Sequence, residues 1–116
     1  MLNELAKRIY DFNVSMGWRK AGDPPDLATY LMNLHSEVSE WWEAWRRKTD
    51  DQPCDKTEKM LALGLRPLTC REEEAADIII RTLDTSHAYG IDIDEAVRIK
   101  MAYNATRAHR HGGLRA

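Results

Sequence analysis

The sequence predicts a single all-α domain, because its apolar residues recur at helical spacing along most of the chain. Intervals of three and four residues dominate, and the strict alternation typical of a half-buried strand is nearly absent. With 116 residues, 43% of them hydrophobic and 31% charged, the chain has the size of one domain around one core. We therefore expect a bundle of four or five helices that spans residues 1–116.

The first two helices carry the clearest patterns. Residues 2–16 are predicted to form the first helix, and Gly17 marks its end. The second helix is expected to begin with Asp23 as its N-cap and Pro24 in its first turn, and to end near Lys48. Its apolar residues recur at intervals of four and three, which is typical of a helix that packs against neighbours in a bundle: Leu27, Leu31, Leu34, Val38, Trp41 and Trp45.

Residues 49–69 separate the second helix from the third, and we interpret them as an insertion or a lid. Asp55 and Glu58 have the spacing of a capping box, which predicts a short helix that ends at Gly64. The segment is expected to lie over a functional site or to extend an interface between subunits.

Two further capping boxes predict the last two helices. Thr69 and Glu72 begin a helix that ends at Gly90. Asp92 and Glu95 begin another, over about residues 93–110. Residues 111–116 are expected to be a flexible tail.

The charge and cysteine content exclude several classes of protein. The net charge is −2, with 17 Lys+Arg against 19 Asp+Glu, so no global basic field attracts nucleic acid or anionic lipid. No apolar run approaches the roughly 20 residues of a membrane-spanning helix. Cys54 and Cys70 form neither a CxxC pair nor a zinc-binding pattern with histidine. We expect a cytoplasmic protein with no membrane partner and no specific nucleic-acid partner.

Paired carboxylates on the second helix are the first candidates for chemistry. Glu37 and Glu40 lie three residues apart and therefore share one face beside the apolar stripe. Neither has a cation three or four residues away, whereas Glu43 has Arg46 and Arg47 at those offsets. An isolated ExxE pattern is most often a solvated surface, but unpaired carboxylates beside an apolar stripe favour a bound cation.

The third helix supplies a matching pair, Glu74 and Asp77, separated by two alanines that permit close helix packing. Four carboxylates from two antiparallel helices form an all-oxygen site, which suits Mg²⁺ or Mn²⁺ better than zinc. The competing interpretation is structural ion pairing, since Arg71 precedes Glu74 by three residues and Arg81 follows Asp77 by four. We place Glu73 off the Glu74–Asp77 face, and the identity of a general base stays open.

Two further groups suggest a nucleotide ligand. Lys100, Asn104, Arg107 and His111 share one helix face, and a basic face opposite an acidic metal site suits a polyphosphate. Alone, this stripe equally describes a solvated surface or an arm that contacts nucleic-acid phosphates. Trp18 follows Gly17 in a turn and is the candidate for stacking on a base.

Taken together, these motifs resemble the MazG-type all-α nucleoside triphosphate pyrophosphohydrolases, over most of the chain. The residues that carry the resemblance are His35-Ser-Glu37-Val-Ser-Glu40, Glu73-Glu74-Ala-Ala-Asp77-Ile-Ile, Tyr89-Gly90-Ile-Asp-Ile-Asp-Glu95-Ala, and Lys100 through Asn104 and Arg107 to His111-Gly112. Trp18 ahead of the Pro-Leu entry to the second helix is similar to the base-stacking tryptophan of the branch that cleaves dCTP. The spacing between Glu40 and Glu74 is longer than is common in that family, and residues 49–69 account for the difference.

The resemblance implies a helical bundle that assembles as a homodimer or homotetramer. It implies Mg²⁺-dependent cleavage of a ribo- or deoxyribonucleoside triphosphate to the monophosphate and pyrophosphate, in nucleotide-pool house-cleaning. Glu37, Glu40, Glu74 and Asp77 would bind the metal as the catalytic set, and Lys100, Asn104 and Arg107 would hold phosphates. The alternative function is a non-catalytic helical dimer that serves as an interaction or nucleic-acid-binding module.

Overall fold

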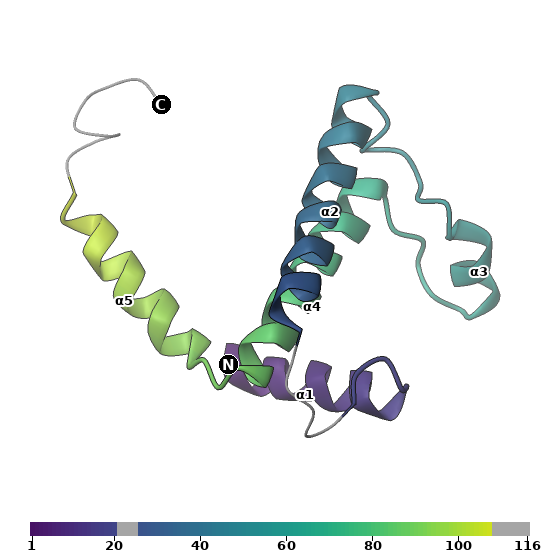
Figure 1. Cartoon of the computed structure of the whole chain (residues 1–116). Coiled ribbons are helices and arrows are strands. Elements are labelled where there is room, and N and C mark those ends of the chain that lie inside the picture. The colour runs from purple at the N-terminus through teal and green to yellow at the C-terminus, as the bar shows by residue number, and fades with distance from the viewer. Residues whose placement is uncertain (21–25, 108–116) are drawn as a thin grey trace.

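The computed structural model describes residues 1–20 and 26–107, and its regular elements in these ranges are all helices. The predicted all-α class is therefore confirmed. The helices in chain order are α1 (Leu2–Ser15), α2 (Leu27–Arg46), α3 (Thr57–Ala62), α4 (Cys70–Ala88) and α5 (Ile93–Ala105), as Figure 1 shows.

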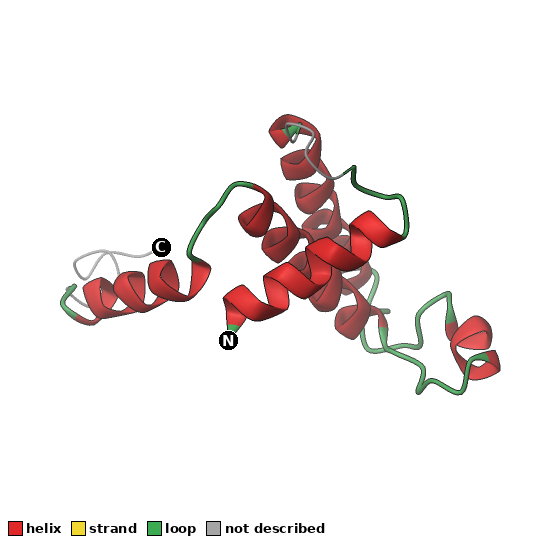
Figure 2. Ribbon diagram, turned by 90° about the horizontal axis from the view of Figure 1, so that it is seen from below, coloured by secondary structure: helices red, strands yellow, loops and turns green. Residues whose placement is uncertain are grey.

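Helix α4 is the centre of the fold. Both α1 and α2 pack on it, with α2 running antiparallel beside it and α1 crossing its C-terminal half (Figures 1 and 2). Helix α5 contacts α1 and extends away from the α2–α4 pair, and α3 projects on the other side of the molecule. A bundle is thus present in α1, α2 and α4, while two of the predicted helices lie outside it in the single chain.

Several predicted helix ends are confirmed because they depend on local chemistry. Gly17 and Gly90 follow α1 and α4 with φ values of 77° and 67°, the left-handed region that glycine adopts without strain. Thr69 and Glu72 form both hydrogen bonds of the predicted capping box at the start of α4. Asp92 caps α5 by accepting a hydrogen bond from the Glu95 backbone N–H.

Three predicted boundaries need correction or lie outside the description. Helix α2 begins at Leu27, where Asp26 accepts a hydrogen bond from the Thr29 N–H; the predicted cap Asp23 and Pro24 lie outside the described residues. Helix α3 has Lys56 at its N-cap and no side-chain cap, so the capping box of Asp55 and Glu58 is wrong. The Asp55 carboxylate pairs instead with Lys56 Nζ at 3.1 Å. Helix α5 ends at Ala105 rather than near residue 110, and the predicted tail, 111–116, falls outside the described ranges.

The first turns of α1 and α5 cap each other. The Asp94 carboxylate accepts hydrogen bonds from the backbone N–H groups of Leu2 (2.8 Å) and Asn3 (3.0 Å). In return, Asn3 Oδ1 accepts a hydrogen bond from the Ile93 N–H at 2.9 Å. These bonds satisfy helix-end donors that have no partner within their own helix, and they set the direction in which α5 leaves the bundle.

A buried ion pair joins the segment after α1 to α4. Arg19 Nε and Nη2 donate to both carboxylate oxygens of Asp84 at 2.8–3.1 Å, and each residue is only 6% exposed. The guanidinium also lies 3.9 Å from the centroid of the Tyr30 ring on α2. The pair therefore connects all three helices of the bundle.

The predicted apolar stripe of α2 is mostly exposed in the single chain. Leu27, Leu31, Val38 and Trp45 lie at the surface, and Leu34 and Trp41 are half-buried. The face of α2 that packs on α4 lies further round the helix and contains the buried Glu37. Most of the stripe therefore stays exposed in the described part of the chain.

The single chain also buries little apolar surface. Its buried hydrophobic residues, within the described ranges, are Ala6, Cys54 and Leu83. The accessible surface is 9077 Å², whereas a compact monomer of this mass exposes about 6,500 Å². The radius of gyration is 17.1 Å, against about 13 Å for a compact domain of this length. These values are those of an open arrangement of helices rather than of a closed globule.

Candidate metal and nucleotide site

Carboxylates from α2 and α4 meet in one pocket. Glu37, Glu74 and Asp77 each place a side-chain oxygen within 4.8 Å of the others. Glu40, also on α2, lines the same pocket, but its side chain is exposed to solvent. The antiparallel packing of α2 on α4 thus unites the two predicted pairs, with three residues in a tight cluster and Glu40 beside them.

The close approach has a simple origin in the sequence. Residues three and four apart on a helix share a face, so each pair projects towards the facing helix. Between the α4 carboxylates lie the half-buried Ala75 and Ala76, and Ala76 lines the pocket. Small side chains at this point let the two backbones approach, which brings the carboxylates together.

Crowding and burial change the acidities of the four carboxyl groups. Burial, with added repulsion from its neighbours, raises the pKa of Glu74 to about 8, and burial likewise raises the pKa of Asp77. A hydrogen bond with Glu37, together with burial, raises the pKa of Glu40. Burial opposes ionisation of Glu37, but hydrogen bonds from Glu74, Glu40 and Arg81 outweigh it and lower its pKa. The cluster therefore retains protons at pH values where isolated carboxyl groups have lost them.

Arg81 neutralises the charge of Glu37 across the helix interface. Its Nε donates to Glu37 Oε1 at 3.0 Å. The sequence-based view that Glu37 lacks a cation holds within α2 but not in the fold, because the partner comes from α4. Arg81 also follows Asp77 by four residues on α4, yet its hydrogen bond goes to Glu37 on α2.

The position predicted for Glu73 is wrong. Glu73 lines the acidic pocket together with Asp77, because residues four apart on a helix lie nearly above each other. Its carboxylate forms an ion pair with Lys56, which also lines the pocket from the segment before α3. Hydrogen bonding to Glu73 holds the pKa of Lys56 above its usual range.

The residues fit a hard divalent cation. Glu74 Oε2 is buried and has no hydrogen-bond partner among the described residues, although buried carboxylate oxygens are normally satisfied. The donors of the cluster are all carboxylate oxygens, the type that Mg²⁺ and Mn²⁺ prefer. Glu37, Glu74 and Asp77 would hold the ion, with Glu40 as the fourth ligand available in the pocket.

Stability in the absence of metal should fall as the pH rises from about 5 to 8. The folded protein holds the Glu74 proton up to a pKa of about 8, whereas the unfolded chain releases it near 4.5. Over this interval the folded state binds more protons, so raising the pH lowers the free energy of unfolding. Thermal unfolding in a chelator at several pH values measures this, with Glu74→Gln as the control that flattens the slope. A melting temperature that rises over the same interval contradicts the assignment.

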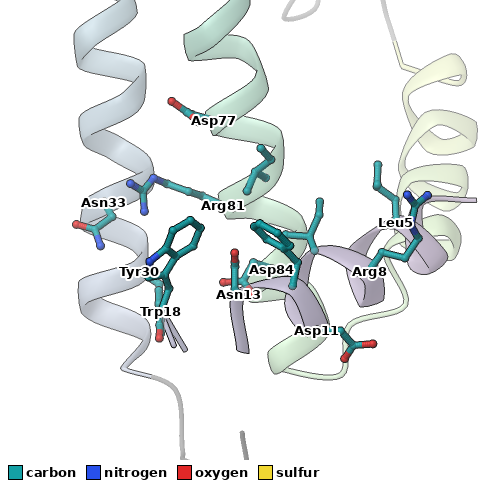
Figure 3. Close-up of a pocket in the computed structure, with 13 residues that line it drawn as sticks. Leu5, Arg8, Asp11, Asn13, Trp18, Tyr30, Asn33, Asp77, Arg81 and Asp84 are labelled. Carbon is teal, nitrogen blue, oxygen red and sulfur yellow. The ribbon is translucent and has the colours of Figure 1, made fainter. Parts of the chain in front are cut away.

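An aromatic pocket adjoins the acidic one. It has a volume of about 860 Å³ and is lined by Trp18 and Tyr30 as well as by polar groups of α1, α2 and α4 (Figure 3). Asp77 and Ile80 line both pockets, so the aromatic pocket and the carboxylate cluster are neighbours at these two residues. Trp18 is 66% exposed and packs edge-on against Phe12, which leaves much of its indole accessible to a ligand.

The α5 residues predicted to hold phosphates do not line either pocket. Lys100 and Asn104 of α5, and Arg107 just after it, are exposed, and α5 packs on α1. Lys100 and Arg107 lie instead 4.9 and 5.9 Å from the centroid of the Tyr103 ring. His111, the last member of that predicted stripe, lies outside the described residues.

Several residues at the site were not predicted from the sequence. Tyr30 and Asn33 line the aromatic pocket one turn or more before Glu37 on α2, and helical spacing alone could have identified them. Lys56 lies in the insertion, and no sequence pattern indicated that it reaches Glu73.

No protein-family model, curated protein or solved structure matches this chain significantly. Across residues 1–20 and 26–107, none of the helices combines the length and apolar character needed to cross a membrane.

Proposed function

We propose that this protein is a Mg²⁺-dependent nucleoside triphosphate pyrophosphohydrolase of the type that its motifs resemble. One observation carries the proposal: a tight carboxylate cluster shares Asp77 with an adjoining aromatic pocket of a size that suits a nucleoside. A metal-binding acidic site beside a stacking surface is the arrangement that a metal-bound nucleotide needs. The products would be a nucleoside monophosphate and pyrophosphate.

Each group has a chemical role in this proposal. Trp18 and Tyr30 hold the base, and Glu37, Glu40, Glu74 and Asp77 hold the metal. When bound, Mg²⁺ would neutralise charge on the phosphates and activate the attacking water. Arg81 lines the aromatic pocket and donates a hydrogen bond to Glu37 of the acidic pocket, and its guanidinium would offset the negative charge of a bound phosphate.

A panel of ribo- and deoxyribonucleoside triphosphates, standard and modified, tests the activity. Each is incubated with the protein and Mg²⁺, and released pyrophosphate is measured by a coupled assay. We expect pyrophosphate from at least one nucleotide and none in the presence of a chelator. Release of orthophosphate alone, or no product from any nucleotide, contradicts the proposal.

We further propose that the protein works in the cytoplasm, where it would control or clean the nucleotide pool. The supporting observation is that Cys54 and Cys70 are free thiols, as is usual in a reducing compartment.

We also propose that the protein acts as a homodimer or homotetramer. The exposed stripe of α2, together with the large accessible surface and radius of gyration, supports burial against a second copy. An assembly would also let one subunit bring Lys100 and Asn104 of α5, with Arg107 just after it, to the acidic pocket of another.

Disrupting the α2 stripe should dissociate the assembly. Leu31 is 49% exposed in the single chain, and Leu31→Glu would place a charge within the apolar stripe that forms the proposed interface. Light scattering is expected to show a dimer or tetramer for the wild-type protein and a monomer or unfolded chain for the variant. Ser39→Glu is the matched control, because it adds the same charge to an exposed α2 residue off the stripe. A monomeric wild-type protein contradicts this part of the proposal.

A further inference from the structure

Lys56 is the single cation among the described residues that line the acidic pocket. The pocket presents five carboxylates: Glu37, Glu40, Glu73, Glu74 and Asp77. Lys56 reaches it from the segment before α3 and pairs with Glu73 and, at 3.1 Å, with Asp55. The ammonium group is thus already held next to the proposed metal site, although it comes from the insertion.

Lys56 lies at the end of the acidic pocket that is remote from the aromatic pocket. Along α4, Arg81 and Asp77 border the aromatic pocket, and Glu73, which binds Lys56, comes two turns before Arg81. Eight residues of helix span about 12 Å. A nucleotide whose base lies beside Trp18 would therefore extend its phosphates past Asp77 towards Lys56.

The pair between Lys56 and Glu73 has one exposed and one largely buried partner. The Lys56 side chain is 54% exposed, so the ammonium is open to a ligand from solvent, whereas the Glu73 side chain is 13% exposed and fixed on α4. A phosphate bearing more than one negative charge is a stronger partner for a lysine ammonium than a single carboxylate. Lys56 can therefore leave Glu73 for a phosphate while α4 and its carboxylates stay in place.

We propose that Lys56 binds the outer phosphates of the substrate and the pyrophosphate that is released from them. The inference rests on the proposed hydrolysis and assigns a phosphate ligand within the same chain, in addition to the α5 residues. In the free protein the Lys56 ammonium is bound to Glu73 at the pocket. In the complex the phosphate replaces Glu73 as the partner of the ammonium. The insertion that carries Lys56 thereby becomes part of the substrate site.

Calorimetric titration of the full chain with inorganic pyrophosphate, in the presence of Mg²⁺, tests this role. Lys56→Gln is expected to raise the Kd for pyrophosphate by about 10- to 100-fold, because one charged hydrogen bond is lost. Affinity for Mg²⁺ alone should stay unchanged or increase. Lys56→Arg should retain most of the pyrophosphate affinity. Lys59→Gln is the matched control, since Lys59 lies in α3 outside the residues that line the pocket.

A double variant tests whether Lys56 contacts the phosphate directly or only neutralises the charge of Glu73. If Lys56 only neutralises Glu73, then Lys56→Gln combined with Glu73→Gln should restore wild-type affinity for pyrophosphate. If Lys56 contacts the phosphate, most of the loss persists in the double variant. Recovery to within about twofold of wild type therefore overturns the proposal.

The remaining outcomes distinguish this inference from the proposed function. A wild-type protein that releases pyrophosphate from a nucleotide, while Lys56→Gln binds pyrophosphate normally, overturns the role of Lys56 alone. A wild-type protein that binds neither Mg²⁺ nor pyrophosphate and hydrolyses no nucleotide overturns both.

Discussion

Asp77→Asn and Glu37→Gln are expected to abolish pyrophosphate release, lowering turnover by about 10³-fold or more. Each change removes a negative ligand from a cluster whose oxygens lie within 4.8 Å of one another. A catalytic metal contributes several kcal/mol to transition-state stabilisation, and about 1.4 kcal/mol corresponds to a tenfold change in rate. The measurement is turnover with Mg²⁺, accompanied by calorimetry of Mg²⁺ binding and circular dichroism to show that the helices remain.

Glu43→Gln is the matched control for these two variants. Glu43 also lies on α2, but it pairs with Arg46 and Arg47 on the helix surface, as its spacing predicts. Its substitution should leave turnover within about twofold of wild type, because exposed ion pairs contribute little. Normal turnover in both Asp77→Asn and Glu37→Gln would refute the metal assignment.

Arg19→Met should strongly destabilise the fold. It leaves Asp84 buried, at 6% exposure, without the guanidinium that binds both of its oxygens. Removing one partner of a buried ion pair costs about 3–5 kcal/mol, because the remaining charge has lost its solvation and its counter-charge. Urea unfolding at a fixed protein concentration measures the change, since assembly would make the stability depend on concentration.

Two comparisons sharpen that result. Lys7→Met removes one partner of the exposed pair with Asp11 and should cost less than about 1 kcal/mol. Arg19→Met combined with Asp84→Leu removes both buried charges and should recover part of the lost stability. A cost for Arg19→Met no greater than that for Lys7→Met would show that the buried pair does not stabilise the fold.

The sequence was most informative where structure depends on neighbours along the chain. The capping box of Thr69 and Glu72 and the left-handed glycines are decided within a few residues, so these helix ends could be predicted. Likewise, the spacing of Glu37 with Glu40 and of Glu74 with Asp77 determined that each pair shares a helix face. The predicted starts of two helices were wrong. Helix α2 is capped by Asp26 rather than by Asp23, and α3 has Lys56 at its N-cap rather than Asp55.

The apolar stripe of α2 shows what hydrophobic periodicity leaves undecided about packing. A regular apolar pattern identifies a face that avoids water, but it does not say which partner covers that face. In the single chain α4 packs beside the stripe, against Glu37, and leaves Val38 and Trp45 exposed. Only the tertiary structure distinguishes the surface of α2 that packs within the chain from the surface that stays exposed.

The sequence by itself determined the helical class, most helix ends and the helix face that each carboxylate pair shares, because each of these depends on spacing along one segment of the chain. Tertiary structure alone decided which charges neutralise one another: Arg81 with Glu37, Lys56 with Glu73, and Arg19 with Asp84. It also decided that α5 leaves the bundle, through the mutual capping of Asn3 and Asp94. These contacts join residues far apart in the chain, and electrostatic pairing depends on distance in space, which no local pattern specifies.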